Sequence, residues 1–349
     1  MSILTVVTSS PPFVEGGHLV IARSLVAALR DSGHQADLVV TPQNRFGRQA
    51  AAYVATWLTD VGRTHDDRPV DQVISLRYPS YAVRHPRHVC WLLHPMREYY
   101  DQWDAFSRPL SWKGRLKENA RRRMIWAADR YLLTKNVSKL FVISATVQRR
   151  LETFGGIPAE VLHPPAPQRA YRVDDYEPYL FAVSRFTPLK RMHLIVEALA
   201  RPEAAGIRAV LAGEGESFDA VSRLVHERGL ADRVSLPGRL DEAQLVEHLA
   251  RCRAVVFPPF DEDYGFVTVE AFASAKPVIT CTDSGGPTEL VQDGVSGLVS
   301  EPTPAALARA FRRVIGSRDL AEHLGVAGTA VAARLTWAAT VARLLLPVN

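Results

Sequence analysis

The chain has 349 residues, of which 47% are hydrophobic and 23% charged, and its formal net charge is +5. This length suits two domains with separate cores, and the near-average composition excludes disordered, collagen-like and low-complexity proteins. Three widely spaced cysteines, Cys90, Cys252 and Cys281, form no disulfide or metal-binding pattern. We interpret them as buried thiols in a reducing compartment.

The first residues contain no basic segment followed by an apolar one, because an apolar run of strand length already occupies residues 3–8. We therefore expect no signal peptide, no run long enough to cross a bilayer, and a cytoplasmic protein. The positive charge could match nucleic acid, an anionic lipid surface or a phosphate-rich ligand. The sequence lacks the mixed aromatic and basic signatures of RNA binding, so we expect no nucleic-acid partner.

The first half of the chain alternates strand and helix patterns. Residues 18–30 carry apolar side chains at helical spacing, and Gly33 follows as a C-cap. The expected strands are residues 3–8, 37–41, 73–75, 89–93 and 140–143, and another helix begins near residue 145. This succession predicts a parallel sheet covered by helices on both faces.

A strongly basic helix is expected within residues 111–135. Its apolar stripe at helical spacing consists of Leu116, Ala120, Met124, Ala128 and Tyr131. Such a helix can rest on an anionic membrane, or it can pack the stripe into the core and leave its charges in water. We favour packing. Four of the six tryptophans fall between residues 91 and 126, so a surface for an acceptor or a membrane is the alternative.

Residues 163–178 are rich in proline and polar side chains, and we interpret them as a linker between two domains. A second alternating pattern follows, with strands expected at 179–184, 209–212, 234–236, 254–257 and 277–281 and helices at 193–200, 217–228 and 268–275. Two such halves are Rossmann-like, and ligands then bind at the carboxyl ends of the strands. A dinucleotide fingerprint is absent from the sequence, because Gly213 and Gly215 lack the third glycine.

Two glutamates, Glu262 and Glu270, stand eight positions apart near the start of an expected helix. Glu262 falls in a loop that Pro259 and Gly265 delimit, whereas Glu270 falls in the first turn of the helix at 268–275. A helix start attracts anions, and carboxylates accept hydrogen bonds from hydroxyls. The arrangement suits a ligand with phosphates at one end and sugar hydroxyls at the other, which describes a nucleotide-sugar.

The following run, residues 267–299, resembles the donor-site signature of the retaining glycosyltransferases of glycosyltransferase family 4. The similar turn positions are Gly285, Gly286, Glu289, Asp293, Gly294 and Gly297. The resemblance implies an α/β fold of the GT-B type, in which two Rossmann-like domains face each other across a cleft. It implies an acceptor-side domain at residues 1–168, a donor domain at 169–335, and a last helix within 336–349 that crosses back to the first domain.

Arg185 and Lys190 follow the first strand of the second half, in the segment VSRFTPLKR. Such cations are commonly solvated loop residues, but the segment resembles the arginine–loop–lysine motif of the same family. The resemblance implies that the pair grips the donor diphosphate, for which arginine supplies a planar fork and lysine a mobile charge. Arg191 stands where the family commonly has glycine, which leaves open whether Lys190 or Arg191 reaches inward.

By the same resemblance, Glu270 accepts hydrogen bonds from the ribose, and Glu262 contacts hydroxyls of the transferred sugar. Further donor contacts are expected at Gly213, Tyr264, Gly265, Phe266 and Val267. The family has glycine and phenylalanine where this chain has Asp263 and Tyr264, so the identity of the sugar stays open. Fixed cations and the helix start can stabilise the leaving diphosphate, so we expect no metal ion and no other cofactor.

In the first half, the segment from His94 to Asp101 resembles a segment of many family members, notably mannosyl and related sugar transferases. The implied role of His94 is a contact with the donor sugar, although a histidine after a strand is more often structural. Gly16 and Gly17 end a loop and open a helix, where backbone N–H groups can approach a phosphate or an acceptor. A plain turn is the alternative there.

The sequence therefore predicts a retaining, metal-independent hexosyltransferase that uses a UDP- or GDP-linked sugar and a hydroxyl acceptor in glycan, glycolipid or cell-surface polysaccharide biosynthesis. The expected catalytic residues are His94, Arg185, Lys190 and Glu262. No carboxylate is an obvious nucleophile, so we expect displacement on one face of the sugar. Alternatives on the same fold are a nucleotide-sugar epimerase, a phosphorylase-like enzyme and a non-catalytic binding subunit. The basic helix fits a peripheral contact with an anionic membrane.

Overall fold

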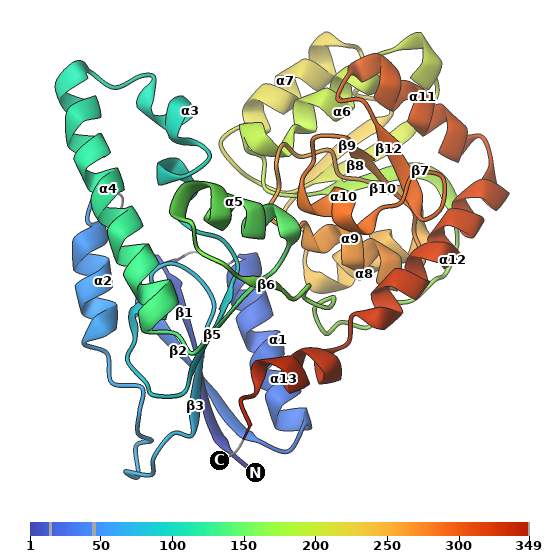
Figure 1. Cartoon of the computed structure of the whole chain (residues 1–349). Helices are drawn as coiled ribbons and strands as arrows, with labels where there is room; N and C mark the ends of the chain where they lie inside the picture. Colours follow the sequence, from blue (N-terminus) through green and yellow to red (C-terminus); the bar gives the residue numbers. More distant parts are fainter. Residues whose placement is uncertain (14–15, 44–46, 348–349) are drawn as a thin grey trace. The chain divides into compact units, whose positions relative to one another are not determined.

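The structure is a computed structural model that describes residues 1–13, 16–43 and 47–347 (Figure 1). The chain folds into two compact units, one formed by Met1–Pro164 together with Thr336–Asn349 and the other by Pro165–Leu335. The boundary follows Pro164, whereas the sequence placed it after residue 168.

The sheet of the first unit contains six parallel strands in the order β2-β1-β3-β4-β5-β6. The strands are β1 (Ile3–Ser10), β2 (Gln35–Pro42), β3 (Gln72–Ser75), β4 (His88–Leu92), β5 (Lys139–Val142) and β6 (Glu160–Val161). Every residue of β3 and β4 is buried, as a parallel sheet covered on both faces requires. The parallel α/β architecture predicted from the alternating pattern is confirmed.

The helices of the first unit are α1 (Gly17–Asp31), α2 (Gln49–Trp57), α3 (Trp103–Ser107), α4 (Trp112–Lys135), α5 (Ala145–Gly155) and α13 (Trp337–Leu344). Helix α13 comes from the end of the chain and packs beside α1 (Figure 1). It is also tied to β3, because the side-chain amide of Gln72 donates to the carbonyl oxygen of Leu344 at 2.7 Å. The last helix therefore completes the first unit.

Helix α4 turns a different face to the protein than we predicted. Its buried residues are Ile125, Asp129, Leu132 and Leu133. In the predicted apolar stripe, Leu116 is 66% exposed, Met124 40% and Tyr131 57%, so the packing prediction is wrong and the stripe faces solvent. The face that packs instead is anchored by a buried carboxylate that apolar periodicity does not reveal.

That carboxylate belongs to Asp129, which accepts hydrogen bonds from the hydroxyls of Tyr53, Tyr81 and Tyr100. The aspartate is completely buried. Desolvation penalises its ionised form more than the three hydrogen bonds favour it, so burial raises the pKa of Asp129 to about 6. Asp129 thus joins α4 to α2 and to the tyrosines that precede β4 and follow it.

The sheet of the second unit is also parallel, with six strands in the order β12-β11-β10-β7-β8-β9. They are β7 (Glu177–Val183), β8 (Arg208–Ala212), β9 (Val234–Gly238), β10 (Cys252–Val256), β11 (Val278–Cys281) and β12 (Gly297–Ser300). Strands β7 and β10 are neighbours, and the chain proceeds from them toward opposite edges of the sheet. This is the strand order of a Rossmann fold, whose crevice lies where the order reverses.

The helices of the second unit are α6 (Met192–Leu199), α7 (Phe218–Glu227), α8 (Glu242–Arg251), α9 (Phe266–Ala273), α10 (Gly286–Leu290), α11 (Pro304–Ile315) and α12 (Arg318–Arg334). The predicted helices 193–200 and 217–228 correspond to α6 and α7. Helix α11 packs against α6, and α12 packs against α9. A large apolar core fills the space between these helices and the sheet.

One stretch of the described chain, Arg318–Leu344, is long and apolar enough to count as a candidate membrane span, because an 18-residue window in it has a mean hydropathy of 1.3. This contradicts our expectation that no run reaches that length. In the structure the stretch is two helices, α12 and α13, which belong to different units. In the fold, 28% of its most apolar window is buried, and a single stretch of this kind is a weak indication of a span.

We expect the first unit to lose stability as the pH rises from about 4 to about 6. An unfolded aspartate has a pKa of about 3.9, whereas Asp129 in the fold titrates near 6, so the folded state holds more protons in this window. The change is roughly 3 kcal/mol for a shift of about two pKa units. Tryptophan fluorescence during urea unfolding reports on this unit, because all six tryptophans belong to it.

In Asp129→Asn the decline between pH 4 and pH 6 is expected to disappear, since the amide does not ionise. Asp219→Asn is the control, because Asp219 is exposed on α7 of the other unit. An equal pH dependence in the wild type and in Asp129→Asn contradicts the prediction.

Candidate functional site

The candidate site of the second unit lies in the two loops that follow β7 and β10. The first loop runs from Ser184 to Arg191, and the second runs from Phe257 to Gly265. Because β7 and β10 are adjacent at the reversal of strand order, both loops leave the sheet at its crevice. Phe260 N donates to the carbonyl oxygen of Leu189 at 2.8 Å, which joins the loops directly.

Lys190 and Glu262, both predicted for the site, contact each other across these loops. The Lys190 ammonium donates to a carboxylate oxygen of Glu262. Both side chains are mostly buried, with 21% and 17% of their surface exposed, and the ammonium lies 5.4 Å from the centre of the Phe257 ring. The structure therefore brings together a cation suited to a phosphate and a carboxylate suited to hydroxyls.

Arg191 makes a separate ion pair, which separates the roles of the two adjacent cations. Its two terminal nitrogens donate to the two carboxylate oxygens of Asp283, at 2.8 and 2.7 Å, and its guanidinium lies 4.9 Å from the Phe260 ring. The residue has a φ of +51°, a left-handed conformation that favours glycine. The glycine common at this position in the resembled family fits that geometry. Lys190 is the cation that pairs with Glu262.

Arg185 is exposed, and in the described part of the chain no carboxylate lies within ion-pair distance of its guanidinium. Its loop is fixed by the neighbouring loop after β8, since Phe186 N donates to the carbonyl oxygen of Glu214 at 2.8 Å. A Cβ on Gly213 would lie 1.8 Å from the carbonyl oxygen of Ser184. Gly213 is therefore needed for close backbone packing, and the donor contacts of Arg185 and Gly213 stay predictions.

A glycine pair holds Glu262 in place. Glu262 N donates to the carbonyl oxygen of Ser284 at 2.9 Å, and Gly286 N donates to that of Glu262 at 2.8 Å. Gly285 has a φ of +71°, and a Cβ there would lie 2.7 Å from the carbonyl oxygen of Glu262. A Cβ on Gly286 would lie 2.4 Å from the Cα of Tyr264. The Gly-Gly turn noted in the sequence thus lets two backbones meet beneath the carboxylate.

Helix α9 starts at Phe266, two positions earlier than predicted, so Glu270 lies in the second turn and not the first. The cause is Gly265, whose φ of +80° lets the chain enter the helix immediately after the loop. Tyr264 is 1% exposed, and its ring centre lies 5.3 Å from that of Phe266. Val267 is buried as well. The donor contacts expected at Tyr264, Gly265, Phe266 and Val267 stay predictions.

Glu270 is 7% exposed and is held by two residues that we did not predict for the site. The guanidinium of Arg169 forms an ion pair with its Oε1 atom, and the hydroxyl of Tyr171 donates to the same oxygen at 3.2 Å. Both residues lie in the segment interpreted as a linker. The segment holds two arginines and two tyrosines, and nothing in its sequence indicates which of them bonds to Glu270.

Metal ligands do not gather at this site. Among residues 1–13, 16–43 and 47–347, no group of three or more His, Cys, Asp or Glu side chains is placed to hold a metal ion. Asp261 is held by its backbone, because its N–H donates to the carbonyl oxygen of Asp283 at 2.9 Å, and its φ is +44°. Metal independence remains a prediction about the reaction.

In the first unit, Gly16 follows β1 and His94 follows β4. Because these strands are parallel, both residues lie on the side of the sheet where the strands have their carboxyl ends. Gly16 is the N-cap of α1, in an extended conformation, and its carbonyl oxygen accepts from Leu19 N at 3.0 Å. Gly17 is the first residue of that helix. His94 is half-buried after β4, and its Nδ1 donates to the carbonyl oxygen of Pro95 at 2.8 Å. Their contacts with a ligand stay predictions.

Arg97, expected near His94, is tied to Asp101. Its side chain donates to Oδ2 of Asp101 at 2.6 Å, and the buried Arg150 lies 2.8 Å from the other carboxylate oxygen. Burial raises the pKa of Asp101, and the two guanidinium groups oppose that change. Arg97 therefore helps to fix the segment after His94.

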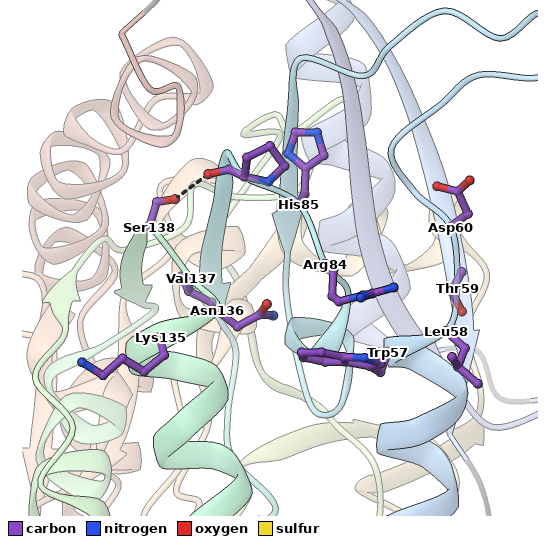
Figure 2. A pocket seen from close by; sticks show the side chains of 11 residues that line it. Trp57, Leu58, Thr59, Asp60, Arg84, His85, Lys135, Asn136, Val137 and Ser138 are labelled. Atoms are coloured by element: carbon purple, nitrogen blue, oxygen red, sulfur yellow. Dashed lines mark hydrogen bonds between the residues drawn. The ribbon is translucent and has the colours of Figure 1, made fainter.

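A separate hollow of about 790 Å³ opens at the amino ends of β4 and β5 in the first unit (Figure 2). The guanidinium of Arg84 lies 5.2 Å from the centre of the Trp57 ring, and Lys135 lies at the rim. Asn136 donates to the carbonyl oxygens of Tyr81 and Val83, so it serves the fold. In Rossmann-like sheets ligands bind at the carboxyl ends, so this hollow is not the candidate site.

Comparisons with known proteins show sequence similarity to glycosyltransferases, and the family-model match lies in the second unit. Residues 167–331 match the family model described as glycosyl transferases group 1. The chain is 32% identical to a D-inositol 3-phosphate glycosyltransferase of Nocardia farcinica over 179 residues, which is 48% of this chain and 40% of that protein. The chain spans about half the length of the curated relatives it matches.

The matches to solved structures extend over nearly the whole chain, unlike the matches to the curated relatives. Sucrose-phosphate synthase of Thermosynechococcus elongatus has a TM-score of 0.74 at 18% identity, and HepE of Anabaena, in complex with UDP and glucose, has 0.68 at 16% identity. Each match covers 97% of this chain and 97% of the other chain. The chain therefore has the GT-B fold of glycosyltransferases, and nearly all of its second unit matches glycosyl transferases group 1.

Proposed function

We propose that this chain is a retaining glycosyltransferase that moves a hexosyl unit from a UDP- or GDP-linked sugar to a hydroxyl acceptor. The observation that carries the proposal is the contact between Lys190 and Glu262 at the strand reversal of the second unit. Glu270 lies on the helix that starts from the same loop. A phosphate-binding cation and two hydroxyl-binding carboxylates correspond to the two ends of a nucleotide-sugar.

The proposed reaction breaks the bond between the anomeric carbon and the diphosphate oxygen, and the electron pair leaves with the diphosphate. Lys190, Arg185 and the amide groups at the start of α9 stabilise the negative charge that develops there. The acceptor oxygen attacks the same face of the sugar, and its proton passes to the departing phosphate oxygen. The anomeric configuration is thereby retained, and no metal ion is required.

Glu262 contacts sugar hydroxyls in this scheme and does not attack the anomeric carbon. Its carboxylate is engaged by Lys190, which lowers its nucleophilicity. His94 and the backbone at Gly16 and Gly17 contribute from the first unit, toward the sugar and the acceptor. A glycosyl adduct trapped on Glu262 would contradict the single-face displacement.

The names of similar proteins support the substrate classes. A structural neighbour was solved with UDP and glucose, which supports a nucleotide-sugar donor and makes UDP the first nucleotide to test. The Nocardia farcinica relative is named for an inositol phosphate, which supports an acceptor rich in hydroxyls. We place this chain in glycan, glycolipid or cell-surface polysaccharide biosynthesis on the same grounds.

Contact with an anionic membrane surface is part of the proposal. The exposed face of α4 carries Trp112, which is 73% exposed, and Leu116, which is 66% exposed. The basic residues Lys113, Arg115 and Lys117 are exposed beside them. An apolar edge flanked by cations suits the headgroup region of an anionic bilayer. A location on the cytoplasmic membrane face follows from this proposal.

A specific donor should stabilise the protein in a thermal-shift panel of UDP-, GDP- and ADP-linked sugars. At a concentration of about 100 times Kd a ligand adds about 2.7 kcal/mol, or roughly 5–10 °C in Tm. The same shift is expected with EDTA present. Product analysis then tests the reaction class, because sugar isomerised without an acceptor, or turnover that requires inorganic phosphate, contradicts glycosyl transfer. Absence of a shift with every nucleotide-sugar contradicts the donor site.

Lys190→Ala should lower kcat by about 10²–10³, because a contact that stabilises the leaving group is lost. The Kd of the donor should change by less than tenfold, because the other diphosphate contacts remain. Arg309→Ala, at an exposed position on α11, is the control and should leave both constants unchanged. Unchanged kcat in Lys190→Ala would exclude the proposed role.

Vesicle sedimentation tests the membrane surface. The wild type should bind vesicles that contain phosphatidylglycerol, should bind them less at high salt, and should not bind phosphatidylcholine alone. The double variant Trp112→Ser, Leu116→Ser should bind at least tenfold more weakly. Val326→Ser, which removes another exposed apolar side chain on α12, is the matched control. Equal binding of both variants contradicts this surface.

A further inference from the structure

Arg169 and Tyr171 form a clamp on the carboxylate of Glu270, and they reach it from the segment that precedes β7. The Arg169 side chain is only 14% exposed, and Tyr171 is largely buried as well. Arg169 is also near Glu242 at the start of α8, with its Nε atom 3.7 Å from the carboxylate. The segment is thus anchored in the second unit at a residue expected to bind the ribose.

The clamp compensates the burial of a charge. A carboxylate removed from water is strongly destabilised unless a cation and hydrogen-bond donors replace the lost hydration. Arg169 supplies the cation, and Tyr171 supplies a neutral donor, because burial raises the pKa of the Tyr171 phenol well above its usual value. The carboxylate of Glu270 is therefore paired and hydrogen-bonded on a helix whose first turn it does not occupy.

The contacts of the clamp fall on one oxygen. The arginine and the tyrosine both donate to Oε1 of Glu270, and no hydrogen bond from the described residues reaches Oε2. Two donors from one side fix the rotation of the carboxylate group, which otherwise turns freely about its last bond. The second oxygen is then presented in one direction, as an acceptor for a ligand hydroxyl.

We propose that Arg169 and Tyr171 are positioning residues for nucleotide binding, which hold Glu270 so that Oε2 accepts a hydrogen bond from a ribose hydroxyl of the donor. This inference rests on the proposed function. It assigns the segment before β7 a part in donor recognition that a linker would not have. The preference for ribose over a sugar that lacks the 2′ and 3′ hydroxyls depends on the clamp. The contacts with the diphosphate do not depend on it.

The test compares the nucleoside diphosphate of the preferred donor with its 2′,3′-dideoxy analogue by calorimetry. Hydrogen bonds to charged groups contribute about 1.5–3 kcal/mol, so the wild type should bind the dideoxy analogue at least tenfold more weakly. Arg169→Met should weaken binding of the ribonucleotide at least tenfold and change binding of the analogue less than twofold. Tyr171→Phe, which keeps the ion pair, should show the same pattern with a smaller change.

Two controls separate positioning from a structural role. Arg172→Met replaces an exposed arginine of the same segment, which pairs with Asp174 and Glu247, and should leave both affinities unchanged. In a Glu270→Gln background, Arg169→Met should cause no further loss of ribonucleotide affinity. Arg169→Lys should restore part of the discrimination.

The outcomes distinguish this inference from the proposed function. If Arg169→Met and Tyr171→Phe weaken both nucleotides equally, or neither, the clamp does not act through the ribose and the inference is overturned while the donor site stands. If the wild type binds no nucleoside diphosphate, the proposed function fails and the inference fails with it. Selective loss of ribonucleotide affinity, abolished in the Glu270→Gln background, supports the clamp.

Discussion

Strands β7 and β10 lie side by side in the second sheet, and this adjacency is the constraint on which the candidate site depends. The residues that follow them are more than sixty positions apart in the chain, yet Lys190 and Glu262 meet because both loops leave the sheet where the strand order reverses. A different strand order would separate the ammonium from the carboxylate. The contact between Lys190 and Glu262 therefore depends on the strand order of the sheet, and neither loop sequence alone produces it.

Tight backbone packing then fixes what the topology brings together. Gly285 and Gly286 allow the backbone at Glu262 and Tyr264 to approach closely, where any side chain would collide. At Arg191 the chain has a non-glycine residue where glycine would be favoured. Its left-handed conformation costs such a residue about 1–2 kcal/mol. Its two hydrogen bonds to Asp283 and its stacking on Phe260 offset that cost, and they join the first loop to the second loop and to the turn after β11.

The sequence predicted features that have a period or a characteristic spacing. Alternating patterns predicted the two parallel sheets, and the resemblance of the segments around Lys190, Glu262 and Glu270 to a known family predicted which loops form the candidate site. Contacts between distant segments leave no such pattern. The prediction of which face of α4 is buried was wrong because the residue that anchors this helix is Asp129. A pattern of apolar residues assigns an aspartate to the solvent-exposed face. Arg169 and Tyr171 were missed since a polar, proline-rich segment gives no sign of which carboxylate it will bond.

The course of the chain also has a consequence for biosynthesis. The first unit is not a continuous segment, because α13 joins it only after the whole second unit has passed. During translation the amino end of β3, where Gln72 will hold Leu344, must wait for a residue made 272 positions later. Domains generally fold in the order in which ribosomes release them, so here the second unit can reach its final form before the first has all its parts. Folding of the first unit is therefore completed only after α13 has been synthesised.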